Sequence, residues 1–411
     1  MKKIKFTTLT ILFFVILSQQ TFSQKTNADS IIIKANALII YKHFTEAIKL
    51  LSEGIKLNPR NSEYYYKRAT VFYKQNKFEN AISDFLTVEK LIPQTVNYEL
   101  AESYSQLKNV EKSIYYLSEY LKKSNKLSES EIKQNTAFNF EENSKQWIDL
   151  WKNTNYSKDE ILINEAIYEA NRYNYAEAFV ILDNLLAKKK EKFQIYEVRG
   201  DLHFATKDYK NAISDYTKSL KIKQKNSICY KKLAETYFLI QKYSKSKDNY
   251  LLYLEKNPNE IEVYFEIAKA DFEQKNYEES EKYINEYLKY YFENLDALFL
   301  YAQLKLIENN NFEALKLFNK CIEKDKSKPE YFAARGEAYF QSKMYEYAER
   351  DFNQSLDLQP ISGEIYFKRG LSRFENNNLK GACSDWQKAE SYRYFKASDY
   401  LQKYCKSMIE N

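Results

Sequence analysis

Residues 63–93 read EYYYKRATVFYKQNKFENAISDFLTVEKLIP, and this stretch decides the fold. Ala69 is followed after twelve residues by Ala81 and after four more by Phe85, and Pro93 ends the unit. Apolar residues recur at intervals of three and four on both sides of the polar turn 75–77, which predicts two amphipathic helices. One such hairpin cannot cover its own apolar face, so neighbouring hairpins must stack.

The same spacing recurs along the chain, with a period of 34 residues from residue 166 onward. The small residue of the first helix is found at Ala35, Ala69, Ala101, Ala166, Gly200, Ala234, Ala268, Ala302, Gly336 and Gly370. The ten repeats therefore begin near Ala28, Ser62, Gln94, Asp159, Phe193, Ser227, Ile261, Leu295, Pro329 and Gly363. Positions within a repeat are numbered from these residues.

This pattern resembles the tetratricopeptide repeat, in which small and large residues stand at fixed offsets in a unit of 34 residues. The resemblance covers ten units, and it implies an all-α, right-handed solenoid of stacked antiparallel helix pairs. It also implies a non-enzymatic function in protein–protein interaction, with no cofactor. The closing run 381–386, GACSDW, looks like the last repeat of many exported bacterial proteins of this family.

Composition excludes several other classes of protein. The chain has 6 Gly and 5 Pro in 411 residues, too few for collagen-like chains, Gly/Pro-rich disordered chains and most all-β folds. Its 2 His lie in different repeats, which argues against a shared metal site, and no phosphate-binding loop or catalytic motif is present. The net charge is +6, and loss of three leader lysines leaves +3, a poor basis for nucleic-acid binding.

Residues 1–23 have the layout of a secretory signal peptide. Lysines in the first five residues precede an apolar run over 9–17, and small residues flank a cleavage site before Gln24. We therefore expect an exported chain, periplasmic or secreted. The alternative is an uncleaved N-terminal anchor, although the run is shorter than the roughly 20 residues of a membrane span. No second apolar run follows, which predicts no integral membrane segment after signal removal.

The predicted organisation has five parts. They are the signal peptide 1–23, three repeats over 28–127, a divergent segment 128–158, seven repeats over 159–396 and a C-terminal capping helix 397–411. The divergent segment has about the length of one repeat and contains Trp147 and Trp151. It is interpreted either as a decayed helical hairpin that keeps the stack continuous, or as a hinge or docking point between two blocks. The polar last helix is expected to cover the final apolar face.

Position seven holds Arg in four repeats, and Asp follows sixteen residues later in the same four. The pairs are Arg68 with Asp84, Arg199 with Asp215, Arg335 with Asp351 and Arg369 with Asp385. In the tetratricopeptide fold this position faces the partner helix, where a lone guanidinium would be costly, so four salt bridges are predicted. The alternative is a row of Arg side chains that binds an acidic ligand.

Cys383 and Cys405 fall in the last repeat and the predicted capping helix. Export to an oxidising compartment would allow a disulfide bond between them, and the alternative is two buried thiols.

The family resemblance also implies that the first helices line a concave groove, into which positions 2, 5, 9, 12 and 13 point. The candidate groove residues are Glu197, Asp201, Phe204, Lys231, Glu235, Phe238, Phe265, Lys269, Phe272, Phe299, Glu337, Phe340, Phe367 and Phe374. In repeats five to ten, ten acids at groove positions oppose only Lys231 and Lys269.

The expected partner is therefore an extended protein or peptide segment that is basic or apolar. The Lys and Asn set with which the family clamps a C-terminal carboxylate is not found at matching positions. One alternative is a solvated acidic face without a ligand. Another is a protein that binds envelope glycan (peptidoglycan) through the groove aromatics. A third, an enzyme on a solenoid scaffold, lacks a convergent polar constellation.

Overall fold

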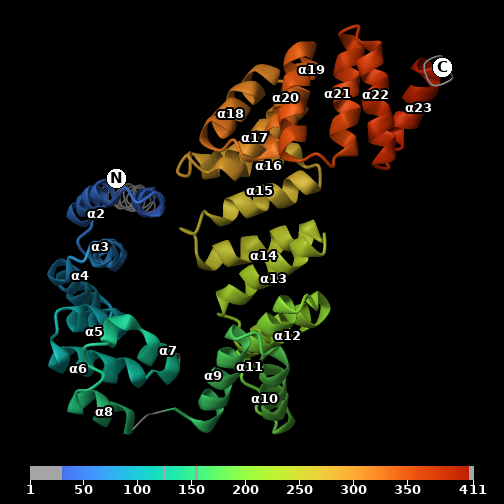
Figure 1. Cartoon of the computed structure of the whole chain (residues 1–411). Coiled ribbons are helices and arrows are strands. Elements are labelled where there is room, and N and C mark those ends of the chain that lie inside the picture. Colours follow the sequence, from blue (N-terminus) through green and yellow to red (C-terminus); the bar gives the residue numbers. More distant parts are fainter. Residues whose placement is uncertain (1–29, 124–125, 153–155, 407–411) are drawn as a thin grey trace, which may run out of the picture. The chain divides into compact units, whose positions relative to one another are not determined.

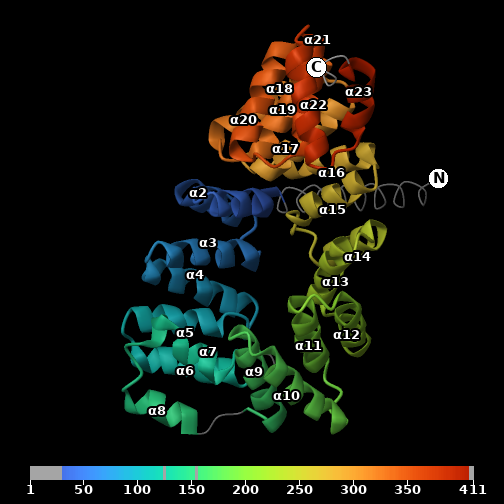
Figure 2. The ribbon, with the colours of Figure 1, turned by 45° about the vertical axis from the view of Figure 1, so that its right-hand side comes forward.

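The computed structural model describes residues 30–123, 126–152 and 156–406, and every regular element in these ranges is helical. Helices pair into hairpins, as α21 and α22 show in both views (Figure 1 and Figure 2), and within each unit hairpins stack through contacts such as those of α4 with α5 and of α20 with α21. The predicted all-α solenoid of stacked helix pairs is confirmed. The chain divides into two compact units, 1–261 and 262–411.

In the first unit, residues 30–40 are helical and precede the labelled helices. These are α2 (Phe44–Leu57), α3 (Ser62–Lys74), α4 (Phe78–Leu91), α5 (Asn97–Gln106), α6 (Val110–Leu121), α7 (Glu129–Gln134), the 3-10 helix η1 (Thr136–Phe138), α8 (Lys145–Lys152), α9 (Lys158–Asn171), α10 (Tyr175–Ala187), α11 (Phe193–Ala205), α12 (Tyr209–Ile222), α13 (Ser227–Leu239) and α14 (Tyr243–Lys256).

In the second unit, four hairpins are followed by one further helix. The helices are α15 (Val263–Glu273), α16 (Tyr277–Leu288), α17 (Leu295–Ile307), α18 (Asn311–Lys324), α19 (Pro329–Gln341), α20 (Tyr345–Leu358), α21 (Gly363–Glu375), α22 (Leu379–Ser391) and α23 (Lys396–Tyr404). Helix α23 packs on α22.

All ten repeats make the turn between their two helices in the same way. Position fifteen has a left-handed backbone conformation, with φ between 58° and 63°, at Lys42, Asn76, Lys108, Tyr173, Lys207, Gln241, Lys275, Asn309, Lys343 and Asn377. The next amide then reaches back to the carbonyl of position eleven, as Asp208 N does to His203 O at 2.8 Å. This arrangement is a Schellman motif, which satisfies carbonyl groups at the end of the first helix.

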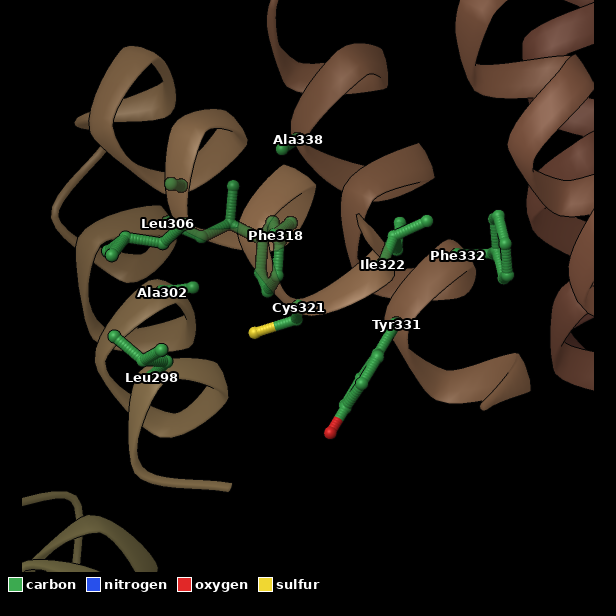
Figure 3. Close-up of a cluster of buried hydrophobic side chains, with 11 residues drawn as sticks. Leu298, Ala302, Leu306, Phe318, Cys321, Ile322, Tyr331, Phe332 and Ala338 are labelled. Carbon is green, nitrogen blue, oxygen red and sulfur yellow. The ribbon is translucent and has the colours of Figure 1, made fainter. Parts of the chain in front are cut away.

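The two helices of a hairpin touch through position eight, which is small, and position 24, which is large. Figure 3 shows this contact in the eighth repeat, where Ala302 and Phe318 are both fully buried. In the tenth repeat Gly370 lies flat against the ring of Trp386, and a Cβ added to the glycine would stand 2.5 Å from Trp386 Nε1. The small residue therefore sets how closely the helices approach.

We predict that Gly370→Ala lowers the free energy of unfolding by about 1–3 kcal/mol, because the added methyl group overpacks the contact with Trp386. The matched control is Gly370→Ala combined with Trp386→Leu, compared with Trp386→Leu alone. The fourth repeat holds Ala166 and Leu182 at the same two positions, so alanine should cost nothing in that background. Urea unfolding of the four chains measures this coupling, and additive effects would contradict the prediction.

The divergent segment 128–158 is helical over α7, η1 and α8. Its residues Phe138 and Trp147 are buried and join Leu117 and Ile132 in one apolar cluster. Helix α8 packs on α6, and η1 packs on α5. In the other described repeats of the first unit, the second helix of one repeat packs on the first helix of the next. Helices α8 and α9 do not pack on each other in this way.

One carboxylate in this segment is buried without a hydrogen-bond partner. Glu141 has no exposed surface, and neither of its oxygens accepts a hydrogen bond from the described residues. The nearby hydroxyls of Ser105 and Ser113 donate instead to the carbonyl oxygens of Ala137 (2.7 Å) and Ala101 (2.9 Å). Burial raises the pKa of Glu141, because the charged form loses its hydration.

We predict that Glu141 lowers stability as the pH rises. The folded chain holds this proton more tightly than the unfolded chain, so the free energy of unfolding falls from about pH 4.3 up to the raised pKa of Glu141. Glu141→Gln should remove this component and raise stability at pH 7 by about 1–2 kcal/mol. Unfolding of both chains at pH 5 and pH 8 measures the difference, and an equal difference at the two pH values would contradict the prediction.

Candidate functional site

The structure brings all four Arg–Asp pairs together, each through two hydrogen bonds. Arg Nε lies 2.7 Å from Oδ2 in Arg68–Asp84, 2.7 Å in Arg199–Asp215, 2.6 Å in Arg335–Asp351 and 2.9 Å in Arg369–Asp385. A second guanidinium nitrogen donates to the other carboxylate oxygen in every pair. The four Asp residues are buried. Their hydration is therefore replaced by a two-pronged ion pair.

Each guanidinium also makes a third contact, which was not predicted. Nη1 donates to the residue sixteen positions before the Arg, which lies in the second helix of the preceding repeat. These acceptors are Ser52 (2.8 Å), Asp183 (2.7 Å), Asn319 (2.7 Å) and Asn353 (2.6 Å). A polar residue at position 25 was the available signal. Each Arg thus joins its own hairpin to the one before it, and the four described guanidinium groups do not form a free row for an acidic ligand.

We predict that Arg199→Leu lowers the free energy of unfolding by roughly 3–5 kcal/mol, because it leaves the buried carboxylate of Asp215 without its cation. Arg199→Leu combined with Asp215→Leu should recover most of this loss. Chemical denaturation of the three variants beside the parent chain measures both effects. A double variant as unstable as the single one would show that the ion pair itself is needed.

A disulfide bond joins Cys383 in α22 to Cys405, directly after α23, and their Cα atoms are 5.8 Å apart. Ala397 and Leu401 of α23 are buried in the same apolar cluster as Trp386. Helix α23 therefore covers the last hairpin and is held to it covalently. The other two cysteines, Cys229 and Cys321, are buried free thiols, and burial raises the pKa of each to about 11.

The first unit contains a cavity of about 940 Å³ on the face formed by the first helices of repeats four to six. Ile163 and Ile167 of α9 line it opposite Glu197 and Asp201 of α11. These four residues occupy positions 5 and 9 of two successive repeats. The cavity also includes Lys126, Tyr156, Glu160, Asn164, Ala170, Asn171, Tyr173, Tyr175, Lys192, Phe193, Gln194, Val198, Leu202, Ala205, Lys223, Asn226 and Ile228.

Two acids of this cavity, Glu197 and Asp201, share one lysine. Lys232 Nζ lies 3.1 Å from Glu197 Oε1 and 2.8 Å from Asp201 Oδ2. The hydroxyl of Tyr216 also donates to Asp201 at 2.8 Å, and the amide of Asn226 donates to Glu197 at 2.8 Å. Burial by itself would lower the pKa of Lys232, but the two carboxylates raise it above its ordinary value. Burial raises the pKa of Asp201.

The comparison of ten acids with two bases in the groove was therefore incomplete. It left out Lys232 and its counterpart Lys368, which stands at position six of the tenth repeat and pairs with Glu337 (3.2 Å) and Glu364 (2.9 Å). Position six was not counted as a groove position. However, its side chain reaches the acid at position nine of the preceding repeat, because stacked first helices lie next to each other.

Comparison with known proteins agrees with the architecture. The family model of the tetratricopeptide repeat matches residues 42–94 and residues 193–226. The chain contains tetratricopeptide repeats. Over 113 residues it is 28% identical to a tetratricopeptide repeat and J domain-containing co-chaperone, DNJ1, of Cryptococcus neoformans. That match covers 26% of this chain, and the chain spans only 22% of the length of that relative.

Two solved tetratricopeptide structures are similar to parts of the chain. A protein from Parabacteroides merdae is 20% identical, with a TM-score of 0.48, and the match covers 59% of this chain and 97% of that one. The C-terminal part of a repeat protein from Cytophaga hutchinsonii is 15% identical, also with a TM-score of 0.48, and the match covers 58% of this chain and 99% of that one.

The phenylalanines at position twelve of the tetratricopeptide repeats stabilise the hairpins. Phe204, Phe238, Phe272 and Phe340 contact Tyr209, Tyr243, Tyr277 and Tyr345, the first residues of the following helices, with ring centroids 5.2–5.8 Å apart. Such edge-on pairs are a favoured aromatic arrangement. These rings therefore help to fix the turn between the two helices.

The other candidate aromatics pack against neighbouring rings. Phe299 contacts Phe318 and Tyr331, and Phe374 contacts Trp386 and Tyr404. Phe367 is only 6% exposed, because Tyr394 and Tyr400 of the C-terminal cap cover it. Its assignment to an open groove was wrong, since the cap closes the last repeat.

The remaining groove candidates lie on α13 and α15. Lys231 Nζ lies 6.0 Å from the ring centroid of Tyr253, and Glu235 is half-buried. Phe265 stacks on Tyr287. Lys269 Nζ lies 4.8 Å above the Phe265 ring and 2.7 Å from Glu266.

The described part of the chain contains no group of three or more His, Cys, Asp or Glu side chains that could hold a metal ion. His203 lies near Asp208, at 3.4 Å, and against the ring of Phe179, while His43 precedes α2 in another repeat. Within the same described ranges, no helix has the length and apolar character of a bilayer-spanning segment.

Proposed function

We propose that this chain is a non-enzymatic interaction scaffold that holds an extended segment of another protein in the cavity of repeats four to six. Tetratricopeptide proteins generally act as protein-interaction scaffolds, which supports the general part of this proposal. The observation that carries the specific part is the cavity itself, because groove positions 5 and 9 of two successive repeats line one hollow. Its volume of about 940 Å³ is in the range of specific binding pockets.

The lining suits an extended peptide. Ile167 and Val198 offer an apolar surface to a side chain. Asn164 and Asn171 stand two helical turns apart on α9, and their amide groups can both donate and accept hydrogen bonds. An extended backbone needs such partners for its N–H and C=O groups when it leaves water. The apolar part of the expected ligand is kept in this proposal, whereas the ion pairs of Lys232 remove the reason for a basic one.

The glycan alternative gains no support from the groove aromatics. The rings at position twelve pair with the tyrosines that begin the next helices, so packing of the hairpins accounts for them without a sugar ligand. We also propose that the chain is exported. The predicted leader 1–23 lies outside the described residues, and the disulfide of Cys383 and Cys405 supports an oxidising compartment.

The proposal is tested by photo-crosslinking from two positions in one repeat. A benzophenone side chain at Gln194 faces the cavity, and one at the exposed Ser214 lies on the second helix of the same repeat. We expect a discrete crosslinked partner from Gln194 and none from Ser214 when the full chain is expressed in its native host. Ala205→Trp, which places an indole at the cavity edge, should reduce the crosslink, while Ala187→Trp on α10 should not. Crosslinks from Ser214 alone would contradict the proposal.

A further inference from the structure

Lysines are concentrated on two successive loops beside the cavity. The loop between α10 and α11 contains Lys188, Lys189, Lys190 and Lys192, and Lys221, Lys223 and Lys225 lie at the end of α12 and in the loop that follows. From residue 216 to residue 234 the chain has six lysines and no Asp or Glu. Because the whole chain carries a net charge of only +6, this local density is not a consequence of composition.

The carboxylates next to the cavity are already paired. Asp159 lies 3.0 Å from Lys192 and 3.6 Å from Lys190. Glu160 lies 3.9 Å from Lys126 and accepts a hydrogen bond from the backbone of Ser157 at 2.8 Å. Glu197 and Asp201 share Lys232, and the exposed Glu191 is the one acid in the loop 188–192, so the loops at the cavity edge still carry more positive than negative charges.

Lys223 is the lysine of this surplus that lines the cavity. Its Nζ lies 4.2 Å from the ring centroid of Phe193, which also lines the cavity, and no described carboxylate is within 4 Å of it. Lys221 and Lys225 on either side of it are exposed. An ammonium group therefore stands beside an aromatic face at the mouth of a hollow with an apolar floor.

We propose that the segment held in the cavity is acidic, with one carboxylate bound at Lys223 and the next at Lys192, which shares the single carboxylate of Asp159 with Lys190. This inference rests on the proposed function and adds the charge of the ligand. The two lysines belong to adjacent repeats, and packed helices lie roughly 8–10 Å apart. An extended chain in the polyproline II conformation advances about 3.1 Å per residue and returns to the same side every third residue, so the two carboxylates should be three residues apart, with an apolar side chain between them.

The cavity favours a peptide over other anions. A nucleic acid or an anionic membrane would use the lysines but not the apolar surface of Ile167 and Val198, nor the amide groups of Asn164 and Asn171. A peptide uses all three features, because it has side chains, a polar backbone and carboxylates.

The direct test is binding of a fluorescein-labelled synthetic peptide to the full chain, measured by anisotropy. The peptide has twelve residues, with Glu at every third position and Leu or Phe between, and in the matched peptide every Glu is replaced by Gln. We expect the Glu peptide to bind at least tenfold more tightly. Its binding should weaken as salt rises from about 0.05 to about 0.5 M, because the charges are screened.

The variant Lys223→Glu with Lys225→Glu should reduce affinity for the Glu peptide at least tenfold. The matched control is Lys324→Glu with Lys326→Glu, an identical charge change at exposed lysines beside the loop between α18 and α19. The control should bind like the parent chain. Ala205→Trp should also weaken binding of the Glu peptide, because the peptide must enter the cavity while its carboxylates bind the loop lysines.

Equal binding of the Glu and Gln peptides, or equal loss in the two lysine variants, would overturn the inference. So would binding of heparin or phosphatidylserine vesicles that depends on Lys223 and Lys225 but not on Ala205, since this would assign the lysines to a polyanion or a membrane. If the Glu peptide does not bind but the benzophenone at Gln194 still crosslinks a partner, only the inference that the ligand is acidic is overturned. Failure of both experiments overturns the scaffold in this cavity as well.

Discussion

The close approach of the two helices in each hairpin is the contact on which the rest of the structure depends. It requires a small residue at position eight and a large one at position 24, as in Gly370 with Trp386 and Ala302 with Phe318. The fixed left-handed residue at position fifteen closes the turn at the same place in every repeat. Since neither helix can cover its apolar face alone, this contact also creates the surfaces through which hairpins stack.

Stacking of apolar faces does not by itself fix how far each hairpin is rotated or shifted against the next. The arginine contacts add directional interactions between neighbouring hairpins. Each guanidinium at position seven binds the Asp of its own second helix and a polar side chain of the preceding second helix. The net stability gained from such a buried ion pair is small, because desolvation of both charges opposes their attraction. The consequence of the ion pair is geometric. Because three guanidinium nitrogens form hydrogen bonds to two hairpins, these hairpins have one favourable register.

The proposed binding surface lies where the repeats differ from one another. Positions eight, fifteen and 24 are constrained by packing, so differences between repeats accumulate on the first-helix face and in the loops between repeats. Around the fifth repeat both regions change together, with a cavity between α9 and α11 and lysines on the two adjoining loops. Helix α9, which lines this cavity, is not packed against α8 in the described part of the chain.

The helical repeat, its register and the Arg–Asp co-occurrence can be predicted from the amino-acid sequence, because all three depend on spacings along one hairpin. It did not determine how side chains meet between hairpins. Lys232 and Lys368 stand at a position that the groove assignment did not include, yet they form ion pairs with acids of the neighbouring repeat. Phe367 looked like a groove residue, yet the C-terminal cap covers it. The cavity, likewise, is lined by the first helices of successive repeats. These features depend on distances between repeats, which no spacing within one repeat encodes, so only the tertiary structure decided them.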